Sequence, residues 1–581
     1  MTDNRDLRRR SLLQAGLGAA ALASVDGPAI AQTAGGGAAP ARPASRASPL
    51  GRPYNVVLVI TDEEAHHLRP AEGYATPARE ELQRRGTTFL NHYIAAAMCT
   101  PSRGVMVSGV PPQVNGVYDQ MELGYVPSLS PERPSLGKIF KKLGYATTWF
   151  GKFELRRDII YPKRTVNYSD ALTAYGFDNF APDGDKVGAP NQGYDTDVYT
   201  AAEAVRWMRT HGQALNAAGT PWLLVVSFVS PHDIMYGDVN QPGRPEQKSM
   251  VGQTITPPPD NELYAKRWRF APSPSQREPL DKPGRPRAQL AYKVGWSAFL
   301  GEIPVDADAM WTDYYNFYLN LIRDNDRNLQ TVIDAMSALD LWSSTVMVRT
   351  ADHGELGGSH GGLRGKGPLP YEQETHVPMV VVHPEHAGGR TCRALTSHID
   401  LVPTLAGLGS GEAARREIEA AGLPGRDFSP LLRDPGQAAL DAVREAVLFN
   451  YVGLQTVDPL YMMRVCRDVA THRAAPPFTE VRPDMTLRGF ISFAYDGRHK
   501  FSRYYAPDNF NTPTTFEALL AGNDLELFDL ERDPDELVNL AVDPQAHRAL
   551  ILRLSEQLNR LIAREVGVND GRFLPEVLRR R

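Results

Sequence analysis

Cysteine is scarce in this chain, which has only three among its 581 residues: Cys99, Cys392 and Cys466. Three cysteines can form at most one disulfide, so no disulfide framework holds the fold together. The odd count also leaves at least one sulfur without a covalent partner. Cys99 draws attention because it stands just before a proline, a serine and an arginine, in the stretch "AAAMCTPSRGVMVSGV".

An excess of one charge and a long apolar run are also missing. The chain has 63 basic and 68 acidic residues, a formal net charge of -5, which gives no electrostatic basis for binding nucleic acid or an anionic membrane. The apolar run from Leu12 to about Val25 is too short, and too rich in alanine and glycine, for a membrane span. We therefore expect a mature protein that contacts neither nucleic acid nor a membrane.

The N-terminus has the features of an export signal. Arg9 and Arg10, followed by Ser-Leu-Leu, resemble the twin-arginine pattern, and "AIA" ending at Ala31 offers a cleavage site of small residues. We predict a twin-arginine signal peptide over residues 1–31 and a disordered Gly/Ala/Pro linker over residues 32–53. This route carries folded proteins through the twin-arginine machinery, so we expect a periplasmic or secreted protein. The alternative is a disordered basic tail.

The rest of the chain predicts an α/β fold. Three apolar runs, beginning near Val56, Trp222 and Val346, read as buried parallel strands, and each is followed by Asp or His. Helical patterns such as residues 314–338 lie between them. Alternating strands and helices with polar residues at strand ends predict a parallel sheet whose functional site lies at its carboxyl edge.

Two later regions differ from the rest in composition and pattern. Residues 236–300 are rich in proline and irregular, so we expect long surface loops there. From residue 445, short alternating segments flank a hairpin signal at Asp496-Gly497, and an amphipathic helix closes the chain. We predict a main domain over residues 54–444 and a small α+β domain, an antiparallel sheet plus a helix, over residues 445–581.

Cys99 lies where a helix is predicted to begin, because Pro101 suits a first helical turn. A sulfur just before a helix N-terminus, four residues from Arg103, lies in a positive field that favours anions. The residues alone thus indicate a nucleophile or an anion site. The alternative is an ordinary core cysteine.

The order Cys99-Thr100-Pro101-Ser102-Arg103, followed by Gly109, resembles the sulfatase signature C-x-P-S-R-x-x-x-x-T-G, with Ser108 where threonine is usual. The resemblance implies an alkaline-phosphatase-like α/β fold with a mixed, mostly parallel sheet. It also implies that a formylglycine-generating enzyme oxidises Cys99 to formylglycine, whose hydrated aldehyde is the nucleophile. It runs from about Asn55 to Ala541.

Consecutive acids after the first strand, Asp62 and Glu63, suit a hard divalent cation. The alternative is a pair of solvated acids at the start of a loop. The resemblance implies that these two, with Asp352, His353 and the modified Cys99, surround one cation. A mostly oxygen donor set favours calcium, with magnesium or manganese as alternatives. Glu63 departs from the family's usual second acid.

The segment "LGYATTWFGKFEL" resembles the family's G-Y-x-T-x-x-x-G-K-W-H-L, which implies that Lys152 contacts formylglycine and sulfate. Glu154 stands where the family has a histidine that accepts a proton from the formylglycine hydrate. A carboxylate could act as that general base if its pKa suits the operating pH. Alternatively, Glu154 is structural and pairs with Lys152.

The resemblance assigns three further residues. It implies that His232, in "SPHD", approaches the leaving-group oxygen, while Lys366 and Arg103 bind sulfate oxygens. We expect hydrolysis of an aryl or related sulfate ester, a small molecule or a carbohydrate. The alternatives are a phosphonate monoester or phosphodiester hydrolase with the same modified cysteine, and a binding protein without catalysis.

Overall fold

The computed structural model describes residues 51–579 except residues 70, 472, 474–475 and 511. The predicted signal peptide and residues 32–50 of the predicted linker lie outside the described residues. All the described residues belong to one compact unit. The separation into domains at residue 445 stays a prediction.

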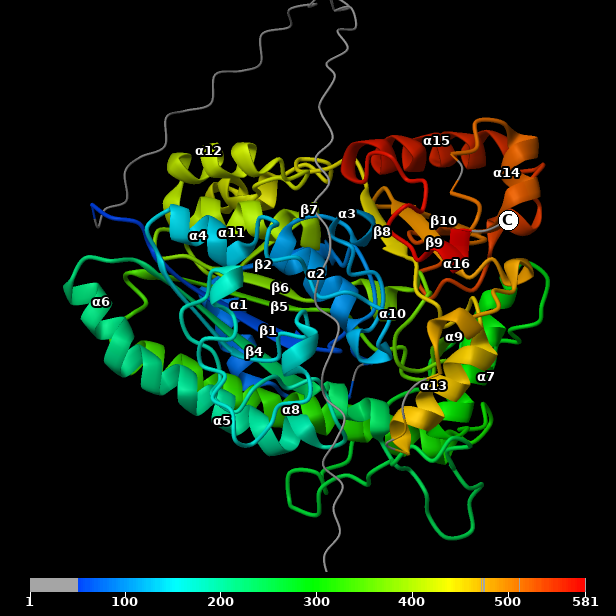
Figure 1. Ribbon diagram of the computed structural model, residues 1–581, viewed down its shortest axis with the longest axis horizontal. Helices are drawn as coiled ribbons and strands as arrows, with labels where there is room; N and C mark the ends of the chain where they lie inside the picture. The colour runs from blue at the N-terminus through cyan, green and yellow to red at the C-terminus, as the bar shows by residue number, and fades with distance from the viewer. Residues whose placement is uncertain (1–50, 70, 472, 474–475, 511, 580–581) are drawn as a thin grey trace, which may run out of the picture. The chain divides into compact units, whose positions relative to one another are not determined.

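A seven-stranded sheet forms the centre of this unit (Figure 1). Its spatial order is β3-β4-β1-β5-β6-β2-β7, and only β6 runs antiparallel to its neighbours. The predicted fold class, a mixed and mostly parallel sheet between helices, is therefore confirmed. The strands are β1 (Asn55–Asp62), β2 (Thr87–Tyr93), β3 (Ala146–Gly151), β4 (Trp222–Pro231), β5 (Thr345–Ala351), β6 (Met379–Val382) and β7 (Arg390–Ser397).

Strand β1 shows why the sheet is covered on both faces. Val56, Leu58 and Ile60 belong to the apolar core on one face, whereas Val57 and Val59 belong to the core on the other. Helices α2 (Cys99–Ser108), α4 (Leu136–Lys142) and α11 (Leu401–Ser410) cover the first face. Helices α1 (Pro77–Arg85), α5 (Gln192–Trp207) and α8 (Asp308–Ala338) cover the second. A strand apolar on both sides can be stable only in such a sandwich.

A second sheet of four antiparallel strands follows, in the order β11-β10-β9-β8. It consists of β8 (Val447–Tyr451), β9 (Phe490–Tyr495), β10 (His499–Tyr505) and β11 (Asp524–Asp529), and α15 (Arg548–Glu565) packs on it. The predicted hairpin joins β9 to β10, and Gly497 there has φ +92°, which favours glycine. A parallel bridge from Ala96 to Asn450 joins this part to the segment before α2.

Residues 236–300 differ from the prediction of surface loops alone. They include helix α7 (Arg287–Leu300), and Trp268 and Trp296 within the same stretch are buried. Tyr292, Trp296 and Leu300 recur every four residues, so one face of α7 packs against the loop that contains Leu363 and Leu369. The many prolines around this helix hid its periodicity.

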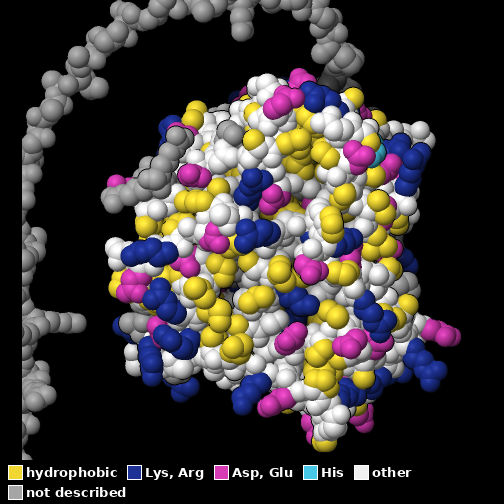
Figure 2. Space-filling model, turned by 90° about the vertical axis from the view of Figure 1, so that its right-hand side faces the viewer, with side chains coloured by type: hydrophobic (Ala, Val, Ile, Leu, Met, Phe, Trp, Pro, Cys, Tyr) yellow, Lys and Arg dark blue, Asp and Glu magenta, His cyan; other side chains and the backbone are white. Residues whose placement is uncertain are grey.

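The other helices are short or peripheral: α3 (Pro112–Asn115), α6 (Gln213–Ala217), α9 (Ser359–Gly362), α10 (Glu372–Thr375), α12 (Glu412–Ala421), α13 (Pro459–Ala470), α14 (Phe516–Gly522) and α16 (Glu576–Arg579). Among the described residues, no helix is both long enough and apolar enough to cross a bilayer. On the face shown in Figure 2, basic and acidic side chains are interspersed without a large patch of one sign, as the balanced composition predicts.

Candidate active site

The predicted site residues gather at the carboxyl edge of the main sheet. Strands β3, β4, β1 and β5 are neighbours and run parallel, so their last residues meet at one edge. All the predicted residues are buried there: Asp62, Glu63, Cys99, Arg103, Lys152, Glu154, His232, Asp352, His353 and Lys366. Cys99 is the first residue of α2 rather than the residue before it.

Four of these residues form a group with the chemistry of a cation site. The potential ligand atoms of Asp62, Cys99, Asp352 and His353 all lie within 4.8 Å of one another. Cys99 Sγ lies 3.1 Å from His353 Nε2 and 3.7 Å from Asp62 Oδ1. His353 Nδ1 lies 3.0 Å from the carbonyl oxygen of Gly354, to which it must donate. The lone pair of Nε2 therefore points into the group, as in a metal-ligating histidine.

Glu63 enters the site in a different way. It has φ +70°, and its Oε2 lies 2.6 Å from Lys366 Nζ. It groups with Asp62 and His232 rather than with Asp352 and His353. Burial raises the pKa of Glu63, while Lys366 opposes the shift. Its Oε1 has no hydrogen-bond partner. Its predicted role as a metal ligand therefore stays a prediction.

Arg103 holds the acidic groups in place. Its Nε donates to Asp352 Oδ2 at 2.8 Å, and its Nη2 donates to Asp62 Oδ2 at 3.0 Å. Its Nη1 donates to Ser227 Oγ and to the carbonyl oxygen of Lys152, each at 2.9 Å. With most donors committed to protein oxygens, Arg103 orients two of the predicted cation ligands.

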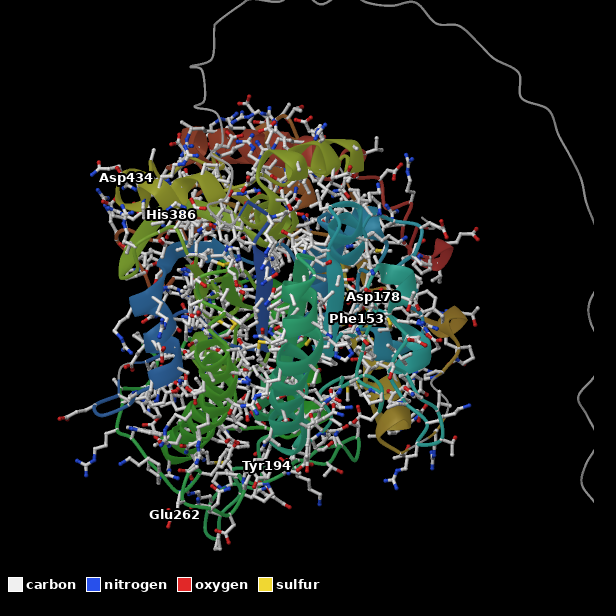
Figure 3. All side chains as sticks on the ribbon, turned by 90° about the vertical axis from the view of Figure 1, so that its left-hand side faces the viewer. Phe153, Asp178, Tyr194, Glu262, His386 and Asp434 are labelled. Atoms are coloured by element: carbon white, nitrogen blue, oxygen red, sulfur yellow. The ribbon has the colours of Figure 1, made fainter. Side chains whose placement is uncertain are left out.

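Lys152 and Glu154 form an ion pair. Lys152 Nζ lies 2.7 Å from Asp62 Oδ2 and 3.0 Å from Glu154 Oε2. Apart from this pair, neither oxygen of Glu154 has a hydrogen-bond donor. Phe153 between them, labelled in Figure 3, packs edge-on against Trp149. Asp185 accepts the backbone N–H groups of Phe153 and Glu154, each at 2.8 Å, which fixes the turn.

Glu122 lies beside Glu154 and is not among the residues predicted from the sequence. It belongs to the short 3₁₀ helix Met121–Leu123, and this segment is held on the start of α2 because Gln120 Oε1 accepts the N–H of Thr100 at 2.9 Å. Burial and the adjacent Glu154 raise the pKa of Glu122 well above its usual range. Glu122 Oε1 has no other partner. No local pattern marks this glutamate, because its neighbour Glu154 comes from the loop after β3.

His232 follows β4, and its Nδ1 has no hydrogen-bond partner. Burial, reinforced by the charges of Lys366 and Lys152, lowers its pKa well below the usual value. Gly188 lies against its ring, since a Cβ there would be 2.6 Å from ring atoms. The imidazole is thus neutral, confined and free to bond to a ligand.

Burial, together with the charge of Asp62, raises the pKa of the Cys99 thiol well above its usual value. A cysteine that acts as a thiolate nucleophile needs the opposite shift. As an unmodified side chain, Cys99 is therefore a poor nucleophile in these surroundings.

Comparisons with known proteins agree with this geometry. A family model described as Sulfatase matches residues 54–411. The chain is 22% identical to a Sulf-1 homolog of Caenorhabditis elegans, described as an extracellular sulfatase, over 61% of this chain and 46% of that one. It is 23% identical to a Delta 4,5-hexuronate-2-O-sulfatase of Bacteroides thetaiotaomicron, over 81% of this chain and 82% of the other. The chain thus spans about half the length of the first relative and most of the second.

Two solved structures share the fold. A 2-O GAG sulfatase superposes with a TM-score of 0.56 at 19% identity, covering 89% of this chain and 93% of the other. A phosphonate monoester hydrolase of Agrobacterium radiobacter superposes with a TM-score of 0.58 at 20% identity, covering 88% of this chain and 96% of the other. At these identities the similarity establishes the architecture.

Proposed function

This chain belongs to the sulfatase family, and from this premise we propose that it hydrolyses a sulfate ester, aryl or related, to an alcohol or phenol and inorganic sulfate. One observation carries the proposal. The buried group of Asp62, Cys99, Asp352 and His353 lies near two buried lysines, Lys152 and Lys366, whose charges both act on Cys99.

The proposed nucleophile is residue 99 after conversion to formylglycine. Its hydrated aldehyde would supply a hydroxyl that attacks sulfur. Two findings support this assignment. Cys99 begins α2 at the centre of the charged groups, and its surroundings disfavour a thiolate.

The residues present fit a divalent cation. Asp62, Asp352 and His353 would hold it together with residue 99, while Glu63 would contribute only if it left Lys366. The two carboxylates favour calcium or magnesium, and the imidazole nitrogen also suits manganese. When bound, the cation would polarise the sulfate oxygens and the nucleophile.

The two lysines would bind the sulfate group. Lys152 and Lys366 bring ammonium groups to the site from two different segments, one after β3 and one from the loop before α10. Both are fully buried, where a positive charge interacts strongly with charge that develops in the transition state. Arg103 would fix the orientation of Asp62 and Asp352.

The remaining roles concern protons. His232 is neutral in the free enzyme because burial and the two lysines lower its pKa. A bound sulfate ester would offset the lysine charges and allow His232 to carry a proton to the leaving oxygen. The attack would leave the sulfate group on one oxygen of the hydrate, which would then collapse to the aldehyde and release inorganic sulfate as its C–O bond breaks. Glu154 would accept the proton of the remaining hydroxyl in that step, and Glu122 would be its neighbour. The structural alternative, in which Glu154 only pairs with Lys152, fits the distance of 3.0 Å.

A second candidate is hydrolysis of phosphonate monoesters or phosphodiesters, favoured by the shared fold with a phosphonate monoester hydrolase. Initial rates on 4-nitrophenyl sulfate, 4-nitrophenyl phenylphosphonate and bis(4-nitrophenyl) phosphate separate the two. We expect the highest kcat/KM on the sulfate. A clear preference for either phosphorus ester would reject our first choice.

The modification has its own test, which is mass spectrometry of a peptide that spans residues 95–110. Conversion of Cys99 to formylglycine lowers the peptide mass by about 18 Da. An unmodified thiol in active, natively produced enzyme would overturn the proposed nucleophile.

We also propose export by the twin-arginine route to the periplasm or beyond, after a formylglycine-generating enzyme has acted. The support is the Arg9-Arg10 pair and a relative described as extracellular. The double variant Arg9→Lys/Arg10→Lys should keep the protein in the cytoplasm, as measured by cell fractionation. Unchanged export would contradict this route.

A further inference from the structure

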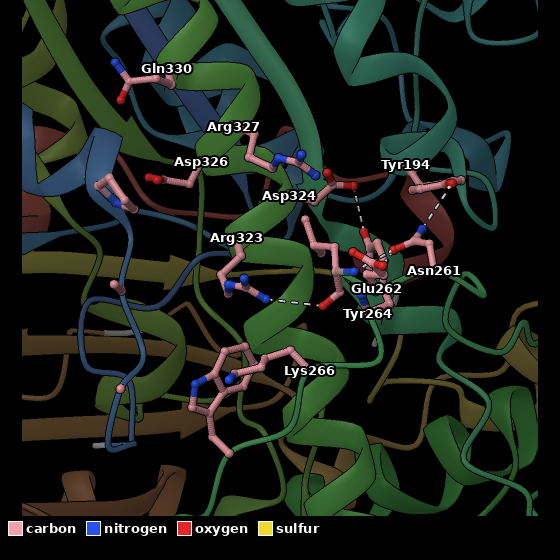
Figure 4. A pocket seen from close by; sticks show the side chains of 15 residues that line it. Tyr194, Asn261, Glu262, Tyr264, Lys266, Arg323, Asp324, Asp326, Arg327 and Gln330 are labelled. Atoms are coloured by element: carbon pink, nitrogen blue, oxygen red, sulfur yellow. Dashed lines mark hydrogen bonds between the residues drawn. The ribbon is translucent and has the colours of Figure 1, made fainter.

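A cavity of about 910 Å³ is lined by no residue of the cluster around Cys99, and Figure 4 shows its lining side chains. Its walls are the N-terminal turn of α5, the middle of α8, the segment of residues 261–268 and the residues before α1. Figure 3 shows Tyr194 and Glu262, two residues of this lining, at one end of the molecule. None of the proposed catalytic residues lines the cavity.

One corner of the cavity combines an unpaired donor with two cations. Trp268 is 6% exposed, and its indole N–H is buried without a hydrogen-bond partner. The guanidinium of Arg323 lies over the indole ring, 5.0 Å from its centroid. Lys266 lies on the same side of the cavity as Arg323 (Figure 4). A buried N–H without a partner costs free energy, and an acceptor from a ligand would offset that cost.

Neither cation of this corner has an ion-pair partner, although Asp324 across the cavity interacts electrostatically with Arg323. Arg323 donates to the carbonyl oxygen of Leu263 at 3.2 Å and to Asn320 Oδ1 at 3.0 Å, both uncharged. Within the described part of the chain, no carboxylate forms an ion pair with Lys266 or Arg323. The corner therefore offers an anion the positive charges of Lys266 and Arg323 and the indole N–H of Trp268.

The opposite side of the cavity offers acceptors and a second aromatic face. Asp324 Oδ2 accepts from the hydroxyl of Tyr264 at 2.9 Å, and Glu262 lies beside them (Figure 4). The ring of Tyr194 is 41% exposed, and its hydroxyl accepts from Asn261 at 3.4 Å. Such groups suit the hydroxyls and the apolar face of a pyranose ring.

We propose that this cavity binds an acidic sugar unit of a polysaccharide substrate, with its carboxylate or sulfate group at Trp268, Arg323 and Lys266. A neutral sugar would leave both cations without an ion-pair partner, and an inorganic anion would leave most of the volume unfilled. The inference rests on the proposed function, since it identifies the ester's carrier as an acidic glycan.

The cavity has a structural link to the proposed leaving-group histidine. The backbone N–H of Tyr194 donates to Asp233 Oδ2 at 2.9 Å, and the N–H of Gly193 donates to Oδ1 at 3.1 Å. Asp233 directly follows His232, so one turn supports both a wall of the cavity and the catalytic imidazole. A glycan bound in the cavity would therefore be positioned relative to the reacting ester.

Calorimetric titration of the non-hydrolysing Cys99→Ala protein tests the proposal independently of turnover. The probes are a heparin hexasaccharide (sulfate and uronate), a hexagalacturonate (uronate only) and maltohexaose (neutral). We expect at least one acidic hexamer to bind at least about 10-fold more tightly than maltohexaose, and the stronger of the two identifies the preferred acid group. Equal affinity for all three probes, or no binding, would overturn the proposal.

Substitutions locate the binding. Lys266→Gln and Trp268→Phe should each weaken binding of the preferred hexamer by about 10-fold, because the first removes a charge and the second only the indole N–H. Lys248→Gln is the matched control, since Lys248 is exposed and lies outside the cavity lining. If both cavity variants bind the hexamer as tightly as the control does, the proposed location of the binding site is wrong.

A kinetic measurement separates failure of this site from failure of the proposed function. In otherwise wild-type enzyme, Lys266→Gln should raise KM for a sulfated oligosaccharide by about 10-fold, with kcat and the rate on 4-nitrophenyl sulfate unchanged. Loss of activity on every sulfate ester in the unsubstituted enzyme would reject the function instead, while the calorimetry would still report on the cavity.

Discussion

Two buried charge clusters of this molecule differ in how completely their polar atoms are used. In the Lys500 cluster, the ammonium group of Lys500 contacts three oxygens, those of Pro370 (2.8 Å), Glu372 (2.6 Å) and Glu536 (2.9 Å). In the active-site cluster, by contrast, several buried polar atoms have no hydrogen-bond partner: Glu63 Oε1, Glu154 Oε1 and His232 Nδ1.

The difference teaches what each cluster contributes. The Lys500 cluster, in which every donor is satisfied, joins the smaller sheet to the loop around α10. Removing one of its members leaves buried charges without a partner. Unpaired buried groups cost free energy in the free protein and gain partners only when a substrate or cation arrives. We therefore expect substitutions in the active-site cluster to reduce activity more than stability, and substitutions in the Lys500 cluster to do the reverse.

Cys99→Ala should give the largest effect. It removes the proposed nucleophile, so kcat/KM on the best sulfate ester should fall on the order of 10⁴-fold or more. The free energy of unfolding should stay within about 1 kcal/mol, because the side chain has only weak polar contacts in the cluster. Enzyme kinetics and urea unfolding check the two parts. Retained turnover would refute the assigned nucleophile.

Lys500→Met should chiefly affect stability. It leaves Glu372 and Glu536 buried without their cation, which costs about 3–5 kcal/mol of unfolding free energy. The control is Lys142→Met, since Lys142 is exposed and lies 3.7 Å from Glu417, a pair worth less than about 1 kcal/mol. The kcat of the folded fraction should be unchanged. Equal losses in the two variants would show that the burial of the cluster has no energetic importance.

Glu154→Gln distinguishes the two readings of that residue. If Glu154 is the general base, kcat should fall by about 10²-fold or more, while KM changes little. If it only pairs with Lys152, KM should rise and kcat should stay within about 10-fold. Glu122→Gln should lower kcat less than Glu154→Gln does. Glu536→Gln is the control from the other cluster, where kcat should not change.

Gly188→Ala tests the confinement of His232. A Cβ at this position would lie 2.6 Å from the imidazole, and φ is +89°. We expect the displaced ring to lower kcat/KM by about 10-fold. Gly116→Ala is the matched control, because Gly116 has φ +82° with nothing within 4 Å, so it adds the same backbone strain without the contact. Equal losses in both variants would assign the effect to strain alone.

The sequence predicted the fold and the location of the strand-end residues at one edge of the sheet, for a physical reason. Apolar runs followed by Asp62, His232 and Asp352 encode both a strand and a side chain at its end, so position along the chain implies position in the sheet. Lys366 and Glu154 stand in loops and could be assigned only by resemblance to a family. Their burial beside Glu63 and Lys152 is visible only in the structure.

Other features depend on contacts between distant segments. Glu122 is important because it lies beside Glu154, and Gly188 because it lies against His232. No local sequence pattern reveals either contact. Most donors of Arg103 are used by protein oxygens, a set of contacts that the sequence does not reveal, and its binding of sulfate stays a prediction. Residues 236–300 were predicted as surface loops, but helix α7 and the buried Trp268 show that proline-rich composition can hide packed structure.

Substitution of Asp197 should have the smallest effect on stability. It extends the comparison because Asp197 belongs to neither cluster. It lies buried beneath the end of β4, where it accepts the N–H groups of Val229 and Ser230, each at 2.8 Å. Burial raises its pKa to about 7, while these two bonds oppose the shift. The folded state therefore binds more protons than the unfolded state between about pH 4 and pH 7.

The sign of the pH dependence follows from that proton difference. The stabilising contribution of Asp197 is complete below about pH 4 and is lost as the pH rises through 7, with a slope of at most about 1.4 kcal/mol per pH unit. Asp197→Asn cannot titrate, so its unfolding free energy should fall less between pH 5 and pH 7, although one backbone N–H loses its acceptor. Urea unfolding at several pH values in this range measures both slopes. Identical slopes would show that Asp197 is ionised in the folded protein throughout this pH range. In that case two backbone N–H groups would stabilise a buried carboxylate as fully as the ammonium group of Lys500 does.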